Sequence, residues 1–101
     1  MTSIGDYVFE NCSSLTGIVI PDSVTYIGTA AFRGCCSLIS ITIGNGVAFI
    51  GNFVFDYCLN LTINYRGRKE QWDQIRKGSD WKIGSKIKVI HCTDGDIKLH
   101  A

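Results

Sequence analysis

The sequence lacks a long apolar run. No stretch of about 18 consecutive apolar residues occurs, so the sequence predicts no membrane insertion. The first residues, Met-Thr-Ser-Ile-Gly, contain no basic segment followed by an apolar core, which a secretory signal requires. Since Met1 occupies the repeat position held by Val24 and Val47 in later copies, we expect residues 1–101 to be the C-terminal piece of a longer array.

Metal-ligand pairs and catalytic signatures are also missing. Zinc sites use ligands about two to four residues apart, and neither a Cys-x-x-Cys motif nor a closely spaced histidine pair occurs. His91 and His100 flank the turn at Asp94-Gly95-Asp96, but an EF-hand loop needs more oxygen ligands and no nucleophile is tied to a base. We interpret both histidines as strand and turn residues, and we expect no cofactor and no enzymatic activity.

Basic residues are few, and no arginine cluster is interleaved with aromatics. The net charge of +1 is made of −3 over residues 1–65 and +4 over residues 66–101. A field this modest predicts no nucleic-acid binding. The change of composition near Tyr65 predicts a boundary between a repeat array, residues 1–65, and a C-terminal cap, residues 66–101.

What the sequence does contain is an internal repeat of 23 residues. Each copy reads Ile-Gly, three residues, Phe, two residues, Cys, two residues, Leu. Nearly every position that matches between copies is apolar or glycine. These are the residue types that pack in the common core of a repeat protein. The pattern predicts a solenoid with one coil per copy. The ring and thiol positions are Phe9, Phe32, Phe55, Cys12, Cys35 and Cys58.

Five cysteines invite a disulfide or metal hypothesis. One thiol per coil at a fixed position would stack about 5 Å from the next, facing the interior, and buried thiols pack as small hydrophobes. We therefore favour a structural core ladder of these thiols and phenylalanines over a disulfide or a metal site. Cys36 replaces Ser13 and Leu59 of the other copies and should point outward, which makes it the most reactive thiol.

Two short extended segments fit each repeat. In residues 17–20, alternation directs Val19 to one face and its isoleucine neighbours to the other, and segments 40–43 and 62–65 should pair beside it in parallel. A second segment, 24–27 in the middle copy, should be followed by a turn at its Ile-Gly glycine. The next seven residues of each copy are expected to form a single helical or 3₁₀ turn.

The segment after the array has a different pattern. Trp72 and Ile75 lie three residues apart and predict a short helix that ends at Gly78 and covers the open end of the coil. Residues 86–92 alternate as a strand, and Asp94-Gly95 is a hairpin turn signal.

Outward positions that the repeat does not specify are candidates for binding. Alternation directs one residue of each first strand outward, and one slot holds an aromatic residue in the first and third copies where the middle copy has alanine. Local packing between coils is the alternative interpretation of the aromatics. The candidate binding residues are Val19, Thr42, Asn64, Tyr7 and Phe53.

The unit from Leu15 to Leu38 resembles the BspA-like leucine-rich repeat, a class of bacterial surface proteins with 23-residue units. The motif is Leu-x-x-Ile-x-Ile-Pro-x-x-Val-x-x-Ile-Gly-x-x-Ala-Phe-x-x-Cys-x-x-Leu, and the match covers residues 1 to about 65. The resemblance implies an α/β fold: a right-handed leucine-rich-repeat solenoid, β-rich with short parallel strands and helical turns. A C-terminal helix and β-hairpin would cap it.

The resemblance also implies a role in recognition. We expect a noncatalytic protein-binding or adhesion module at the cell surface or outside the cell, with a host matrix protein or another cell surface as partner. The alternative is a purely structural segment that caps a longer array while recognition lies upstream. Because Ile4, Val8 and Phe9 lack an upstream coil, self-association through this end is a further expectation.

Overall fold

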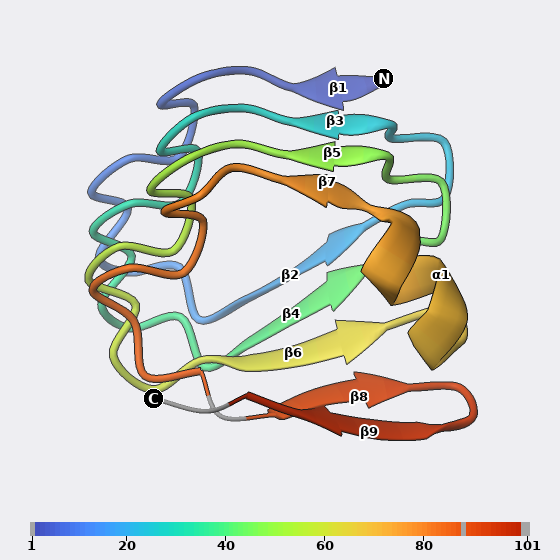
Figure 1. Cartoon of the computed structure of the whole chain (residues 1–101). Coiled ribbons are helices and arrows are strands. Elements are labelled where there is room, and N and C mark those ends of the chain that lie inside the picture. Colours follow the sequence, from blue (N-terminus) through green and yellow to red (C-terminus); the bar gives the residue numbers. More distant parts are fainter. Residues whose placement is uncertain (1, 88, 100–101) are drawn as a thin grey trace.

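The chain winds into a β-solenoid of about four coils, described here by a computed structural model for residues 2–87 and 89–99. Figure 1 shows two stacks of strands that face each other across the interior. The short-strand sheet contains β1 (Ser3–Ile4), β3 (Tyr26–Ile27), β5 (Phe49–Ile50) and β7 (Arg76–Lys77). The five-stranded sheet contains β2 (Gly17–Ile20), β4 (Ser40–Ile43), β6 (Thr62–Tyr65), β8 (Val89–Cys92) and β9 (Gly95–Lys98). One helix, α1 (Lys69–Gln74), lies between β6 and β7.

Strand pairing follows the repeat, as the sequence predicts. All pairs in both sheets are parallel except β8–β9, because each coil returns the chain to the same edge in the same direction. In the five-stranded sheet Ile18 pairs with Ile41, Ile41 with Ile63 and Ile63 with Ile90. The slip of one residue in the third copy is therefore absorbed before β6, and the inward face stays apolar.

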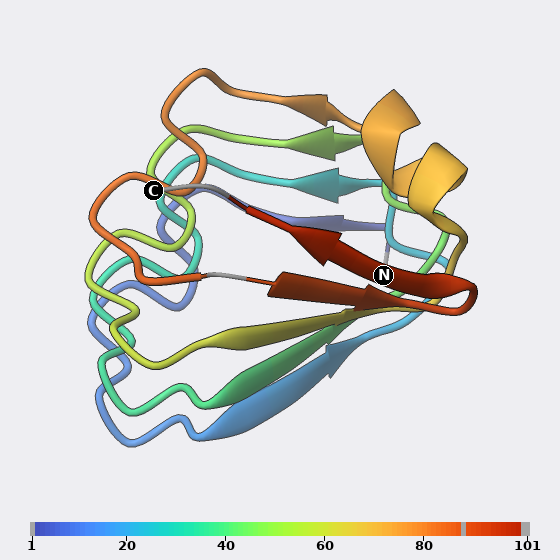
Figure 2. The same cartoon turned by 60° about the horizontal axis from the view of Figure 1, so that its bottom comes forward.

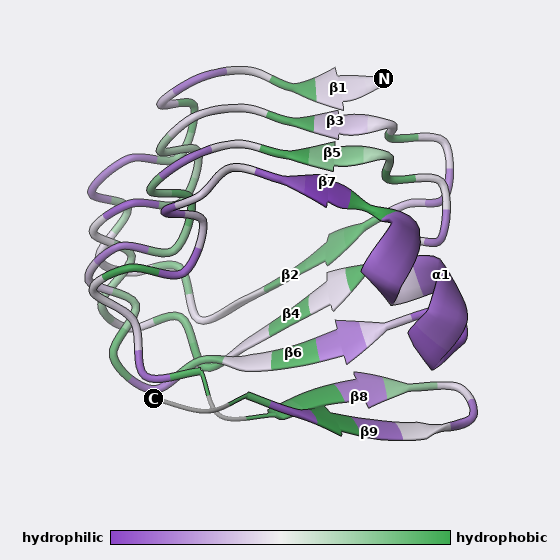
Figure 3. Ribbon diagram, viewed as in Figure 1, coloured by the Kyte–Doolittle hydropathy of each residue, from purple (hydrophilic) through white to green (hydrophobic). Residues whose placement is uncertain are grey.

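The core is a column of repeated side chains. Phe9, Phe32 and Phe55 stack with centroid separations of 5.3 and 6.1 Å, and Trp81 meets the end of the column edge-on at 6.1 Å. Figure 3 shows hydrophobic stretches along β2 and parts of β4, β6 and β8, while β7 and α1 are largely hydrophilic. Stacked aromatic pairs add about 0.5–1.5 kcal/mol beyond their buried area, so the column reinforces every coil contact.

The prediction of a helical or 3₁₀ turn after each second strand is wrong. Residues 29–34 form successive hydrogen-bonded turns in which Ala30 and Gly34 have φ of 55° and 78°. A right-handed helical turn requires negative φ throughout, and Ala30 N–H instead donates to Asn52 O of the next coil at 2.8 Å. The backbone here is shared between bonds to its own turn and bonds to the next coil.

The glycine after each short strand is required by close approach rather than by a positive φ. Gly51 lies so near the preceding coil that a Cβ there would be 2.7 Å from Thr29 N and 2.9 Å from Gly28 C. The sequence predicted that glycine is needed here for a turn, and that reason is wrong. The glycines with positive φ lie elsewhere, at Gly34, Gly84 and Gly95.

The helix ends earlier than the sequence suggests. It stops at Gln74, and Gly78 follows β7 instead of capping α1. Gly78 N–H donates to Ile50 O at 2.8 Å, so it occupies the place that Gly51 has one coil earlier. Both sheets thus continue beyond residue 65, and the division into residues 1–65 and 66–101 stays a prediction.

The C-terminal hairpin closes the five-stranded sheet, and Figure 2 shows it lying along the edge of β6. Its turn is Thr93–Asp94, one residue before the predicted Asp94–Gly95, because Cys92 pairs with Gly95. Trp72 of α1 is 2% exposed and packs edge-on against Tyr65 at 5.2 Å and Trp81 at 5.7 Å. Helix and hairpin together cover the last coil. No helix among the described residues is long and apolar enough to cross a membrane.

Candidate binding surfaces

The outer face of the five-stranded sheet carries three of the five candidate residues in one row. Val19 pairs in register with Thr42, and Thr42 with Asn64. The row continues through His91 to Asp96, whose side chains form a hydrogen-bonded pair at 2.7 Å between Nδ1 and Oδ1. Val19 is 56% exposed, while Thr42 and Asn64 are half-buried. The structure therefore places apolar, hydroxyl, amide and ionic groups side by side.

Sequence reasoning missed that His91 and Asp96 extend this row. The signal was available, because Val-Ile-His-Cys at 89–92 alternates in phase with Thr-Ile-Asn-Tyr at 62–65. The flanking outward positions are small or uncharged, at Gly17, Ser40 and Thr62. The face is consequently flat and uncharged in its centre, with charge gathered on the hairpin. His100 lies outside the described residues.

The aromatic candidates Tyr7 and Phe53 lie apart from that row, on the turn side of the solenoid. Both have left-handed backbones, with φ of 60° and 59°, and both are exposed, at 54% and 38%. Ala30 holds the same conformation between them. The structure thus divides the five residues into a sheet row and a turn-side pair.

Tyr57 is a further exposed aromatic that sequence reasoning passed over. Its φ is 64°, and the same slot holds Asn11 (φ 61°) and Gly34 (φ 78°) in the other copies. Asparagine and glycine adopt this conformation readily and tyrosine does not. The coil geometry therefore imposes a left-handed backbone at this repeat position, and Tyr57 adopts it at a cost in strain.

A glycine and alanine comparison at Tyr57 tests this backbone strain. We expect Tyr57→Gly to be more stable than Tyr57→Ala by about 1 kcal/mol, since only alanine retains the left-handed penalty. Urea unfolding of both variants measures the difference. An alanine variant as stable as the glycine variant would show that Tyr57 does not hold this conformation in solution.

The thiol column is buried where coils lie on both sides. Cys35 and Cys58 are buried, and their Sγ atoms lie 3.1 and 3.2 Å from the carbonyl oxygens of Phe9 and Phe32, one coil back. Cys12, in the first coil, is half-buried. Burial raises the pKa of Cys58 to about 12. Within residues 2–87 and 89–99 no cluster of three or more His, Cys, Asp or Glu could hold a metal ion.

Thiol labelling of the native protein should separate the cysteines. We expect Cys36, which is exposed, to react with iodoacetamide first, and Cys35 and Cys58 only after unfolding. The raised pKa of Cys58 keeps its thiolate scarce even at pH 9, which slows the reaction further. Mass spectrometry of peptides over a time course measures each rate. Modification of Cys58 as fast as Cys36 would contradict the buried column.

A charged column runs beside the thiols. Arg33 lies between Glu10 and Asp56 of the neighbouring coils, with nitrogen–oxygen distances of 3.8 and 3.2 Å. The three residues occupy the same position in successive copies but differ in type. In the solenoid their charges therefore alternate in sign from coil to coil. The Arg33 and Glu10 side chains are 44% and 31% exposed, so that pair stabilises by about 1 kcal/mol or less, whereas the Asp56 side chain is only 15% exposed.

Two surface pockets accompany these faces. One, of about 320 Å³, is lined by Leu59, Asn60 and Thr62 on one side and by Lys86 and Val89 on the other. The other, of about 260 Å³, lies between the loop after β4 and α1 and is lined without any charged side chain.

Repeated coils, parallel sheets and a sealed C-terminal end define a solenoid of the leucine-rich-repeat class. The family described as "BspA type Leucine rich repeat region (6 copies)" matches residues 1–77. The chain belongs to this BspA-type leucine-rich repeat family.

One solved structure is also similar to the chain. It is a leucine rich cell surface protein from Faecalibacterium prausnitzii, with 24% sequence identity and a TM-score of 0.41. The match covers 75% of this chain and 32% of that one, so this chain spans about a third of the length of that protein. No curated protein gives a significant match.

Proposed function

We propose that this chain is a noncatalytic protein-binding module of a cell-surface leucine-rich repeat protein, with adhesion to a host matrix protein or another cell as its role. The observation that carries the proposal is the row Val19, Thr42 and Asn64 on the outer face of the five-stranded sheet. Family membership supports a recognition role, and the similar structure carries the words "cell surface" in its description.

The chemistry of this face favours protein contact. Its centre is uncharged, so docking there removes no charged group of this face from water, and the exposed Val19 offers an apolar contact at one end. His91 and Asp96 add hydrogen-bonding groups at the other end. A standard interface covers about 800 Å² per partner, so a partner would use most of this face.

Binding to purified matrix proteins tests the proposal. Fibronectin, laminin and collagen coated on a sensor surface provide the panel, and we expect saturable binding to at least one. Thr42→Arg and Asn64→Arg should weaken it at least about tenfold by placing charge in the centre of the contact. Ser79→Arg, on an exposed turn after β7, is the matched control and should bind normally. Absence of binding to the whole panel, or an equal loss in the control, would contradict the proposal.

A second candidate role is structural capping of a longer array. The sealed end favours it, since Trp72 and Ile75 of the cap are 2% and 6% exposed and cover the last coil. Caps of this kind keep the terminal hydrophobic layer of a solenoid away from water. A chain that binds no partner, but stabilises upstream repeats when fused to them, would support this role over adhesion.

We also propose self-association through the opposite end. Phe9, Cys12 and Leu15 are only partly buried, whereas their equivalents in the second coil are fully buried. Ile4 is only 6% exposed, so the apolar surface left uncovered at the first coil is smaller than the sequence suggests. Light scattering should show a dimer at high concentration, and Phe9→Asp should return the monomer. A monomer at every concentration would contradict this association.

A further inference from the structure

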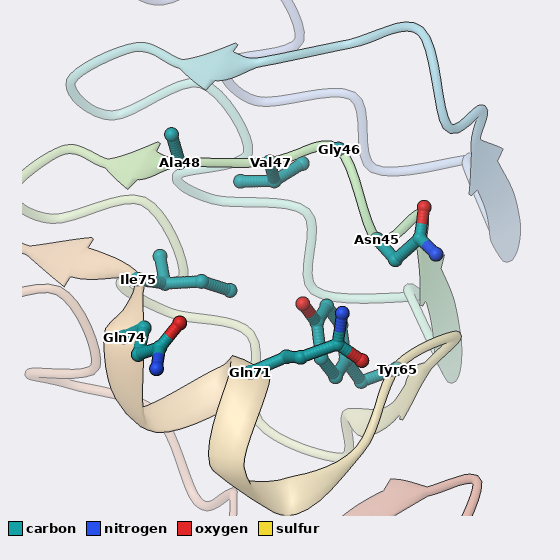
Figure 4. Close-up of a pocket in the computed structure, with 8 residues that line it drawn as sticks. All are labelled: Asn45, Gly46, Val47, Ala48, Tyr65, Gln71, Gln74 and Ile75. Carbon is teal, nitrogen blue, oxygen red and sulfur yellow. The ribbon is translucent and has the colours of Figure 1, made fainter.

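The pocket between the loop after β4 and α1 is built from uncharged hydrogen-bonding groups. Figure 4 shows the side chains of Asn45, Gln71 and Gln74 around it, with Tyr65 at its centre. It arises because α1 replaces the tight loop that joins the two sheets in the earlier coils. The pocket volume is about 260 Å³.

Tyr65 supplies a fixed hydroxyl that a ligand in the pocket could use. Its side chain is 4% exposed and its ring packs edge-on against Trp72, so the ring is fixed. Its hydroxyl makes no hydrogen bond to any described residue, and no buried polar side-chain atom of those residues lacks a partner, so the oxygen reaches solvent through the pocket. Figure 4 shows it directed into the space between Asn45 and Ile75. Because no group of the described residues uses this fixed hydroxyl, it can hydrogen-bond to water or to a ligand in the pocket.

The Gln71 side-chain amide is held in place beside this space, and the backbone of Asn45 is anchored at its other side. Gln71 accepts a hydrogen bond from Arg68 N–H at its Oε1, at 2.8 Å, which fixes the side chain and leaves its Nε2 donors unused. Asn45 is anchored through its backbone N–H, which donates to Asp22 Oδ1 at 3.0 Å, so its side-chain amide stays available. Desolvation raises the pKa of Tyr65, which keeps the hydroxyl a donor at neutral pH.

The side chains that line the pocket indicate which class of ligand it can bind. Phosphates and carboxylates are disfavoured because no Lys, Arg or His lines the pocket. An extended peptide is disfavoured because β4 and β6 are each paired on both sides and offer it no free edge. Hydroxyl groups both donate and accept, as the amides and the tyrosine do, and Val47 and Ile75 supply an apolar wall for carbon–hydrogen groups.

We propose that this pocket binds one ring of a neutral saccharide, with the Tyr65 hydroxyl and the Gln71 and Asn45 amides as its hydrogen-bonding groups. The site lies apart from the Val19, Thr42 and Asn64 row, so it does not depend on the proposed protein-binding role. A shallow site of this size and polarity fits a dissociation constant in the millimolar range, which several such sites on one surface would strengthen.

Titration of the ¹⁵N-labelled protein with methyl glycosides of glucose, galactose, mannose and N-acetylglucosamine tests the site. We expect at least one glycoside to shift the backbone amides of residues 45–48 and 71–75 saturably. Tyr65→Phe should weaken this binding at least about tenfold. It should leave the melting temperature unchanged, since the hydroxyl it removes has no partner in the free protein.

Controls separate this site from general surface effects. Asn60→Ala removes an exposed amide from the other pocket and should leave glycoside binding unchanged. No shift with any glycoside, or shifts that persist in Tyr65→Phe, would overturn the proposal. Shifts produced by N-methylacetamide but by no glycoside would assign the pocket to peptide groups, which also overturns it.

Discussion

Replacing Phe32 with alanine is expected to cost about 3–5 kcal/mol of unfolding free energy, enough to leave the chain at the margin of stability. Phe32 is fully buried at the middle of the aromatic column, with stacked rings on both sides. Truncation opens a cavity that the neighbouring coils cannot fill, because backbone hydrogen bonds fix their spacing. Thermal unfolding followed by circular dichroism should show a fall of at least about 12 °C in melting temperature.

The matched control is the same substitution at Phe9. Phe9 is only partly buried and stacks on one ring instead of two, so we expect Phe9→Ala to cost about half as much. Equal losses at the two positions would show that the first coil is covered in solution, as a dimer through that end would produce.

Replacing Gly51 with alanine is expected to destabilise the protein by about 3 kcal/mol, the upper part of the range for overpacked sites. The added Cβ would lie 2.7 Å from Thr29 N and 2.9 Å from Gly28 C, and backbone atoms cannot yield as a flexible side chain can. The two coils must separate locally, which stretches the bond from Gly51 N–H to Ile27 O, now 2.9 Å. Urea unfolding measures the change.

Gly17→Ala serves as the comparison. A Cβ there would sit 3.5 Å from Ser40 Oγ, an ordinary contact, and the backbone conformation suits an L residue. This variant should be neutral or gain about 0.4–1 kcal/mol because alanine has less freedom in the unfolded chain. A loss at Gly17 as large as that at Gly51 would mean that strand glycines matter here for a reason other than close approach.

The coils and the strands were predictable because they depend on periodicity. Phe32 recurs every 23 residues and Ile41 recurs at Ile18 and, after the one-residue slip, at Ile63; these repeats predict which side chains share a core and which strands pair in parallel. The parts that sequence reasoning got wrong depend on backbone geometry. The turn at Ala30 was expected to be helical because alanine gives no hint of a left-handed conformation, and bonds to the next coil decide it.

The candidate sites were predictable only in part. Alternation was sufficient to direct Val19, Thr42 and Asn64 outward. The pocket at Tyr65 was not foreseen, because the third copy uses tyrosine where earlier copies use isoleucine and the pattern counts both as core positions. Only the position of α1 beside it shows that the hydroxyl faces an opening.

The covering of the last coil by α1 and the hairpin has a consequence for how the chain folds during its synthesis. Residues 66–99, which supply Trp72, Trp81 and the hairpin, leave the ribosome after the coils, and coils can begin to stack as soon as two of them have emerged. Every nascent chain therefore carries an uncovered apolar layer on its last coil until residues 66–99 have emerged. Premature termination before Trp72 leaves that layer exposed permanently, so truncated products become substrates for chaperones and proteases.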